Sequence, residues 1–239
     1  MVTRRQPGLS VVGEHPDESV LEEAALLDAR RIHKRWRRDV APVLYGVDLS
    51  IHPGEIVGIS GRNGVGKTTL MRILSGLIEP DAGTITAAGL DPRTDRRAFL
   101  RLVAFLPAAN TGVYARLTVR HNLELWSDLA LVPRRRRRAA VDASINRFEL
   151  GALAKQRADR LSMGQRQRVR LALATLHGPR VLLLDEPTNS LDDEGIASLN
   201  AAVDETLHSG GCVVWAAPRI DEREIRVDRH FTLEEGGLR

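Results

Sequence analysis

Hydrophobic and polar positions alternate over short runs in the first third of the chain. Such runs predict half-buried strands, and His52-Pro53-Gly54 predicts a turn between the second and the third of them. The predicted strands span residues 27–36, 43–51, 56–60 and 84–88. The front of the chain is therefore expected to be rich in sheet.

Two later segments carry apolar residues at helical spacing instead. They follow the i, i+3, i+4, i+7 rule, so each is expected to form a helix that buries one face. From residue 56 onward, such helices alternate with strands, which is typical of an α/β domain with a largely parallel sheet. The spaced residues are Leu70, Ile73, Leu74 and Leu77 in the first segment and Val169, Ala172, Leu173 and Leu176 in the second.

Residues 118–160 follow neither pattern clearly. They are rich in charge and lack strand-like runs, so they are expected to form several helices, the last of which ends before Leu161. We interpret them as a helical insertion. Residues 1–24 mix both signs of charge with glycine and proline, which favours a flexible tail with at most one helical turn near residues 18–25.

The composition limits the classes of protein that fit. The 239 residues include 32 arginines and 3 lysines against 31 acidic residues, so the net charge is only +4 and does not by itself indicate nucleic-acid binding. A single cysteine, Cys212, excludes an internal disulfide and favours a reducing compartment. No apolar run reaches the roughly 18–20 residues of a transmembrane helix and no secretory signal follows Met1, so a cytoplasmic location is expected.

A glycine-rich loop follows the predicted strand at 56–60. It satisfies the pattern G-x-x-x-x-G-K-[ST] between a strand and a helix, where backbone N–H groups and a helix N-terminus surround a nucleotide's phosphates. Lys67 is expected to pair with the β- and γ-phosphates, and the Thr68 hydroxyl to coordinate magnesium. The candidate nucleotide-binding residues of the loop are Gly61, Arg62, Asn63, Gly64, Val65, Gly66, Lys67, Thr68 and Thr69.

A second apolar run, residues 181–184, ends in two acids. A run of this kind suits a strand buried on both faces, and ligands of α/β sheets bind at the carboxyl ends of such strands. Asp185 is therefore expected to hold magnesium through water. Glu186 is expected to accept a proton from an attacking water, and Lys67 and Glu186 are the catalytic candidates.

Between these two elements, Leu161-Ser162-Met163-Gly164-Gln165 matches an LSxGQ signature. Here the sequence resembles the ATP-binding subunits of ABC transporters, and the same order of motifs covers about residues 26–239. Ser162 and Gln165 also form an S-x-x-Q capping box, so the following helix is expected to present free N–H groups to an anion. The other matching stretches are Trp36, where the family stacks the adenine, 117–123, 181–188 and the D-loop 190–192.

The resemblance implies an α/β fold of three parts. These are a P-loop NTPase core with a mostly parallel sheet, an N-terminal antiparallel β subdomain and an inserted helical subdomain at about residues 108–170. It implies one ATP-binding domain over residues 25–239 behind the tail at 1–24, with closing strands near 228–237 and no further domain. It also implies a head-to-tail dimer in which Ser162, Gly164 and Gln165 of one chain contact the γ-phosphate of ATP bound to the other.

The sequence departs from the family at two positions. The family usually places a Gln after the strand that ends at Pro107, and here Ala108 stands there, with Asn110 as the closest amide. The family also ends a later strand in a His that contacts the γ-phosphate, and Pro218 occupies that place. The chain is therefore expected to bind ATP and magnesium, with hydrolysis slowed by Ala108 and Pro218.

Two basic segments remain. The run Arg134 to Arg138 favours a solvated helix face, with anionic lipid or acidic loops of a membrane partner as the alternative. A basic cluster around Trp36 has two interpretations: it adds positive charge near the nucleotide, or its charges protect an exposed edge strand from pairing with other chains. Its members are Arg30, Arg31, Lys34, Arg35, Arg37 and Arg38.

The function that these observations favour is that of an ATP-driven motor subunit for export. The expected partners are a separate transmembrane permease and a second ATP-binding subunit, either a copy or a paralogue, at the inner face of the membrane; no nucleic acid is expected. The alternatives are a soluble ABC-type ATPase and a nucleotide-gated regulator with weak hydrolysis. DNA-repair ATPases of this type insert a long coiled coil between the phosphate loop and the signature. Only 93 residues separate Lys67 from Leu161 here, and they show no heptad repeat, which disfavours that class.

Overall fold

The computed structural model describes residues 24–239 except 38, 40, 109–111, 190 and 222–224. The tail expected at 1–24, apart from its last residue, lies outside the described residues, as do Arg38 and Asn110.

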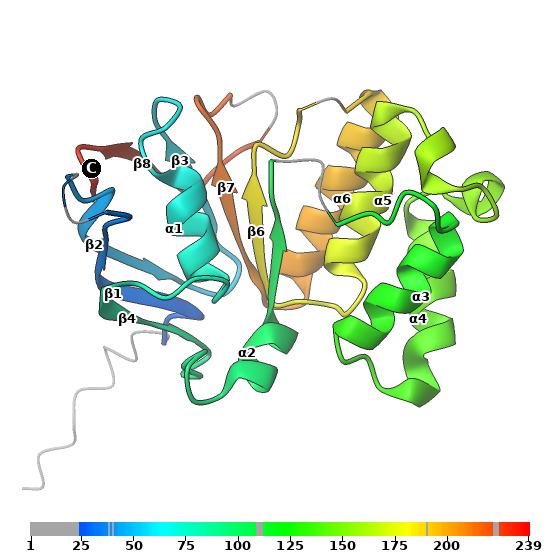
Figure 1. The fold of residues 1–239 in the computed structure, drawn as a ribbon, viewed down its shortest axis with the longest axis horizontal. Coiled ribbons are helices and arrows are strands. Elements are labelled where there is room, and N and C mark those ends of the chain that lie inside the picture. Colours follow the sequence, from blue (N-terminus) through cyan, green and yellow to red (C-terminus); the bar gives the residue numbers. More distant parts are fainter. Residues whose placement is uncertain (1–23, 38, 40, 109–111, 190, 222–224) are drawn as a thin grey trace, which may run out of the picture.

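Two sheets form the framework of the described part of the chain (Figure 1). A three-stranded antiparallel sheet has the order β2-β1-β4, and a six-stranded sheet has the order β5-β6-β7-β3-β8-β9, in which only β9 is antiparallel to its neighbour. This arrangement confirms the predicted fold class. The strands are β1 (Leu27–Lys34), β2 (Leu44–Ile51), β3 (Ile56–Ser60), β4 (Ala82–Ala87), β5 (Val103–Leu106), β6 (Val181–Asp185), β7 (Cys212–Ala216), β8 (Arg229–Glu234) and β9 (Gly237–Leu238).

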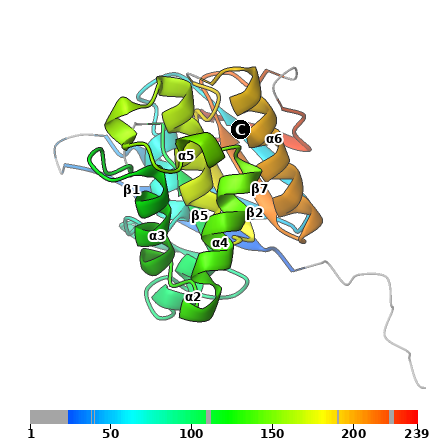
Figure 2. The same cartoon turned by 90° about the vertical axis from the view of Figure 1, so that its right-hand side faces the viewer.

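Helices cover both faces of the parallel sheet. Helix α1 lies between the two sheets, whereas α5 and α6 pack on the other face and α3 and α4 lie beyond them, as Figures 1 and 2 show. Strand β6 explains this layering, because Val181 and Leu183 belong to the core around α1 while Leu182 and Leu184 belong to the core around α5. The helices are α1 (Lys67–Leu74), α2 (Arg96–Leu102), α3 (Val119–Leu129), α4 (Arg134–Arg147), α5 (Met163–Thr175) and α6 (Asp193–His208), with 3₁₀ turns η1 (Gly151–Leu153) and η2 (Ala158–Arg160).

Two details of the predicted helices are wrong. Leu77 is 55% exposed, because α1 ends at Leu74 and Gly76 follows with φ +69°, a conformation that ends the helical repeat. Helix α5 does not bury a single face: Arg168 and Arg170 are buried together with its apolar residues, because the helix contacts α3, α4, α6 and the sheet.

The basic segment before Trp36 does not lie on a sheet edge. Strand β1 is the central strand of its sheet, paired with β2 on one side and β4 on the other, so the prediction of an edge strand protected by charge is wrong. Two of its basic residues form local ion pairs instead, Arg30 with Asp28 at 2.9 Å and Lys34 with Asp81 at 2.8 Å.

Cys212 begins β7 and is fully buried. Burial raises the pKa of its thiol to about 12, which keeps the sulfur protonated and unreactive at neutral pH. This agrees with the prediction that the residue packs in the core. Among the described residues, no helix combines the length and the apolar character that crossing a bilayer requires.

Candidate functional site

The predicted site residues gather where the parallel strands end. Strands β3, β6 and β7 pair in register, so Ile59 and Asp185 both face Ala216 across the sheet. This edge is the upper one in Figure 1, where the loop after β3 leads into α1 and where α5 begins. The topology therefore brings together motifs that lie more than 100 residues apart, as the 117-residue separation of Thr68 and Asp185 illustrates.

The glycines of the loop adopt backbone conformations that other residues rarely reach. Gly61 has φ +151° and Gly66 has φ +121°. A Cβ atom would lie 2.7 Å from the Leu233 carbonyl oxygen at Gly61 and 2.7 Å from a methyl carbon of Val43 at Gly66. Side chains are thus excluded from the loop at both ends, which leaves its backbone accessible at the N-terminus of α1.

Lys67 is folded back along this loop. Its Nζ donates to the carbonyl oxygen of Gly61 at 2.6 Å and to that of Arg62 at 3.2 Å, and the residue is only 5% exposed. The ammonium group therefore lies inside the curve of the loop. Phosphate oxygens are stronger acceptors than these neutral carbonyl groups, so they can draw the ammonium toward a ligand.

Thr68 and Asp185 connect the two predicted nucleotide motifs. The Thr68 hydroxyl donates to Asp185 Oδ2 at 2.7 Å, while Asp185 Oδ1 is buried without a hydrogen-bond partner among the described residues. Burial raises the pKa of Asp185, and nearby Glu186 adds to that effect, although Thr68, Lys67 and the Ala108 backbone N–H oppose it. One hydroxyl and an unsatisfied carboxylate oxygen are hard ligands that suit Mg²⁺, whose charge would favour the ionised carboxylate.

Glu186 is held in a strained backbone conformation directly after β6. Its φ is +49°, which is uncommon for a residue with a long side chain, and its N–H donates to the Ala216 carbonyl at 2.7 Å. Its Oε2 accepts a hydrogen bond from Asn189 Nδ2 at 2.7 Å. Asn189 was not predicted from the sequence, where its signal was only an amide three residues after an acid.

The two departures from the family pattern lie at the same edge. Leu106 on β5 pairs with Leu184 on the parallel strand β6. Ala108 and Glu186 each come two residues later, so they leave the sheet at the same height. Pro218 is exposed, and its carbonyl oxygen accepts a hydrogen bond from the Gly61 N–H at 3.4 Å. Pro218 and the loop residues Gly61 to Asn63 line an open hollow of about 730 Å³.

The predicted capping box is confirmed at the start of α5. The Gln165 N–H donates to Ser162 Oγ at 3.2 Å, and the Ser162 N–H donates to Gln165 Oε1 at 3.1 Å. A Cβ atom on Gly164 would lie 3.0 Å from Asp192 Oδ2, so the signature packs directly against the cap of α6. Ser162 and Met163 are exposed and leave this helix N-terminus accessible from outside the chain.

A buried polar network that the sequence analysis missed lies beneath these loops. Arg170 donates to the Pro107 carbonyl and to Gln167 Oε1, and Gln167 Nε2 donates to the Pro187 carbonyl at 3.3 Å. Helix α5 thereby ties the segment before Ala108 to the segment after Glu186. Polarity alone would place both side chains at the surface, which is why sequence reasoning did not find them.

Trp36 lies in the connection between β1 and β2. It is 55% exposed, and the Lys34 ammonium lies 5.4 Å from its ring centroid. Lys34 pairs with Leu44 at the start of β2, beside Val43, whose side chain limits the space at Gly66. The ring is therefore accessible near the loop, and its stacking on an adenine stays a prediction.

Comparison with known proteins adds independent findings. Residues 44–189 match the family model for "ABC transporter". NatA, an ABC transporter ATP-binding protein of Bacillus subtilis strain 168, is 35% identical over 84% of this chain and 81% of its own length. DrrA3, a daunorubicin resistance ATP-binding protein of Streptomyces coeruleorubidus, is 36% identical over 81% of this chain and 61% of its own length.

The chain spans only 34% of the length of YbhF, a probable multidrug ABC transporter ATP-binding protein of Escherichia coli K12, to which it is 34% identical over 200 residues. Among solved structures, the dimer of the ATP-binding cassette MJ0796 in a post-hydrolysis state with ADP and Pi matches with a TM-score of 0.77. That match has 25% identity and covers 89% of this chain and 96% of the other.

Proposed function

Because the chain belongs to the ABC transporter family of ATP-binding proteins, we propose that it is an ATPase motor subunit that drives export by a separate membrane subunit. The observation that carries this proposal is the 2.7 Å hydrogen bond from Thr68 to Asp185, which unites the phosphate loop with the acidic strand end in one site. The two residues around which catalysis is organised, Lys67 and Glu186, lie at the same edge of the sheet.

Each residue of the site has a separate task. Lys67 exchanges its carbonyl partners for the β- and γ-phosphates, and the loop N–H groups and the α1 N-terminus bind the same phosphates. Thr68 and Asp185 would hold Mg²⁺, which when bound neutralises charge on the phosphate oxygens. Glu186 accepts a proton from the attacking water, and Asn189 holds its carboxylate in place.

The accessible N-terminus of α5 supports the second half of the proposal. Its capped first turn presents N–H groups and the positive end of the helix dipole, which favour an anion. In the proposed head-to-tail dimer, that anion is the γ-phosphate of ATP on the partner chain. Each complete site then needs Lys67 of one protomer and Ser162 of the other.

Complementation between two defective variants tests this arrangement. Lys67→Ala and Ser162→Arg should each abolish most ATP hydrolysis when they are purified alone. An equal mixture should recover about one quarter of wild-type turnover, because half of the randomly formed dimers are mixed and each mixed dimer retains one intact site of two. Steady-state release of phosphate from the mixture measures this recovery.

The control is a mixture of Lys67→Ala with Glu186→Gln. Both changes lie on the same side of the composite site, so a mixed dimer has one defect in each of its two sites and should not recover. If the first mixture stays as inactive as its components, the head-to-tail proposal is wrong even where the single variants confirm the ATPase.

Ala108 and Pro218 lead to a proposal of slow hydrolysis. A methyl group cannot orient water or contact magnesium, and proline offers no hydrogen-bond donor to the γ-phosphate. One missing catalytic hydrogen bond costs about 10²–10³ in rate where a site depends on it. The double variant Ala108→Gln/Pro218→His is therefore expected to raise turnover at least severalfold in a steady-state ATPase assay.

Pro218 is exposed and contributes a carbonyl group to Gly61, which histidine retains, so this substitution should not disturb the loop. Arg97→His, an exposed position on α2 away from the strand ends, is the control and should leave turnover unchanged. Fast hydrolysis by the wild-type chain would show that other groups order the water and the γ-phosphate. A slow wild-type chain together with a double variant that gains no turnover would favour a nucleotide-gated regulator instead.

The proposed partners are a separate transmembrane permease and a second ATP-binding chain. NatA and DrrA3 support this assignment through their names as ATP-binding proteins of a transporter and of drug resistance. In the complex, the chain would lie on the inner face of the membrane. Copurification of the chain with the product of a neighbouring gene that encodes membrane spans would identify the permease.

A further inference from the structure

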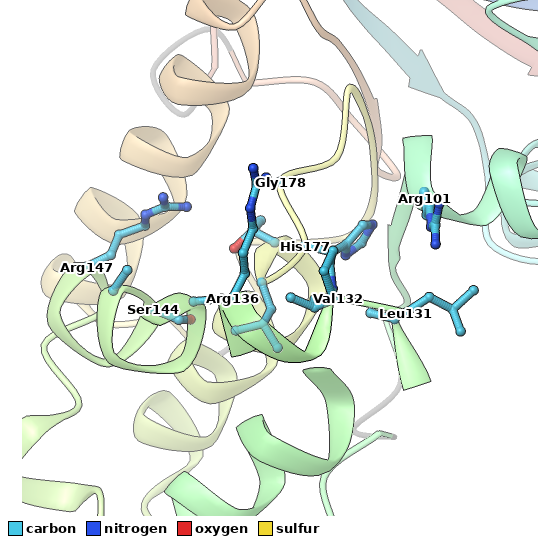
Figure 3. A pocket seen from close by; sticks show the side chains of 14 residues that line it. Arg101, Leu131, Val132, Arg136, Ser144, Arg147, His177 and Gly178 are labelled. Atoms are coloured by element: carbon cyan, nitrogen blue, oxygen red, sulfur yellow. The ribbon is translucent and has the colours of Figure 1, made fainter. Parts of the chain in front are cut away.

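A second hollow lies at the end of the molecule opposite the nucleotide edge. It has a volume of about 380 Å³ and lies among the end of α2, the turn before α4, α4 itself and the segment after α5. Four basic side chains line it, and Figure 3 shows Arg101 and Arg147 at its two ends with Arg136 and His177 between them. We call it the basic hollow.

The charges of the basic hollow are not balanced. None of its lining residues is acidic, and among the described residues neither Arg101 nor Arg136 has an ion-pair partner. Only Arg147 is paired, with Glu205 on α6 at 2.5 Å. Cations gathered from separate elements repel one another, so the arrangement attracts an anion.

His177 supplies an unsatisfied polar group to the same hollow. Both of its ring nitrogens are shielded from water and lack a hydrogen bond of ordinary length in the described part of the chain. Burial lowers the pKa of the ring, which the nearby Val103 backbone opposes, so the ring is neutral and offers one N–H. An unsatisfied buried polar group is costly, and a small turn of the ring would bring one N–H toward an acceptor in the hollow. The rest of the lining is largely apolar and includes Leu131, Val132 and Leu176.

The arginine run of α4 shows that Arg136 differs from its neighbours. Arg137 is occupied, since it pairs with Asp128 and its Nε donates to the Val132 carbonyl at 2.9 Å. Arg134 and Arg135 are exposed and do not line the basic hollow. The run is therefore not uniform: Arg136 lines the basic hollow, although it is exposed like Arg134 and Arg135, and Arg137 is half-buried.

We propose that the basic hollow binds a phosphate-bearing anion, with Arg101 and Arg136 as the primary contacts. A guanidinium group matches the geometry of a phosphate with two parallel N–H donors, and His177 adds a third donor from the side. The apolar wall accommodates hydrocarbon next to the phosphate. Two sources share this chemistry: the headgroup of an anionic lipid and a soluble phosphorylated metabolite.

A pair of double variants with equal charge tests the proposal on the full-length chain. Isothermal titration with glycerol 3-phosphate, and separately with dihexanoyl phosphatidic acid in monomeric solution, measures affinity while saturating ADP occupies the phosphate loop. Arg101→Gln/Arg136→Gln should weaken binding at least about tenfold, because both charge-assisted contacts are lost. Arg134→Gln/Arg135→Gln removes the same charge from two residues of the run that do not line the basic hollow, and should change affinity less than about threefold.

Cosedimentation with vesicles distinguishes the two sources. Binding to phosphatidylcholine vesicles that contain about one fifth phosphatidic acid, lost in Arg101→Gln/Arg136→Gln alone, assigns the site to lipid. Binding of the soluble probes without binding to these vesicles assigns it to a free phosphate compound. The proposal is overturned if neither the probes nor the vesicles bind, or if the two double variants lose affinity equally, which would indicate only general attraction to a basic surface.

Discussion

The Lys67→Ala variant is expected to lose about 10²–10⁴ in affinity for Mg-ATP. The Lys67 ammonium is the only side-chain cation that the phosphate loop holds inside its curve among the described residues, where it lies 2.6 Å from the Gly61 carbonyl. Each charge-assisted hydrogen bond to a phosphate contributes about 1.5–3 kcal/mol, and two such bonds correspond to roughly two to four powers of ten in the dissociation constant. Titration with a fluorescent ATP analogue measures the loss.

Lys155→Ala is the matched control for this change. Lys155 is exposed on the helical side of the molecule and should leave the dissociation constant unaltered. Because the loop carbonyls of Gly61 and Arg62 lose a donor in Lys67→Ala, thermal unfolding without nucleotide should accompany the titration. An unchanged dissociation constant in a folded Lys67→Ala protein would contradict the assignment of the nucleotide site.

Much of this site was predictable because its backbone needs particular residues. A loop that bends at Gly61 and Gly66 with positive φ leaves almost no choice but glycine, so the requirement is visible as a sequence pattern. The strand that ends at Asp185 is buried on both faces and is equally visible as an uninterrupted apolar run. Parallel pairing then brings the two strand ends to one edge without any further information.

The features that the sequence did not predict depend on tertiary contacts. Arg170 is buried among apolar residues, since it donates to the Pro107 carbonyl after β5 and to Gln167, one turn earlier on α5. Leu77 satisfies the helical spacing rule yet lies beyond the end of α1, and only the turn at Gly76 reveals this. The basic hollow draws its basic side chains from residues 101, 136, 147 and 177, and no local pattern connects such distant positions.

The Glu186→Gln variant should keep ATP binding and lose turnover by about two powers of ten, the typical contribution of a positioned proton acceptor. Glutamine has nearly the same volume, and its carbonyl oxygen can accept the hydrogen bond that Asn189 now donates to Glu186 at 2.7 Å. The left-handed backbone at φ +49° and the N–H bond to Ala216 do not depend on the carboxylate. The phosphate loop and the magnesium ligands are also left intact, so only the group that receives the proton is removed.

Because the variant binds ATP but hydrolyses it slowly, we expect it to accumulate in the ATP-bound state. Since hydrolysis reopens the proposed dimer, gel filtration with Mg-ATP should show a larger dimer fraction for Glu186→Gln than for wild type, and dilution without nucleotide should reverse it. Glu124→Gln, an exposed acid on α3, removes the same charge far from the strand ends and should leave both turnover and the dimer fraction unchanged. Full turnover in Glu186→Gln would show that another group accepts the proton. Lost turnover together with lost ATP affinity would mean instead that Glu186 supports the fold of the site, with its strained backbone as the part that the substitution disturbs.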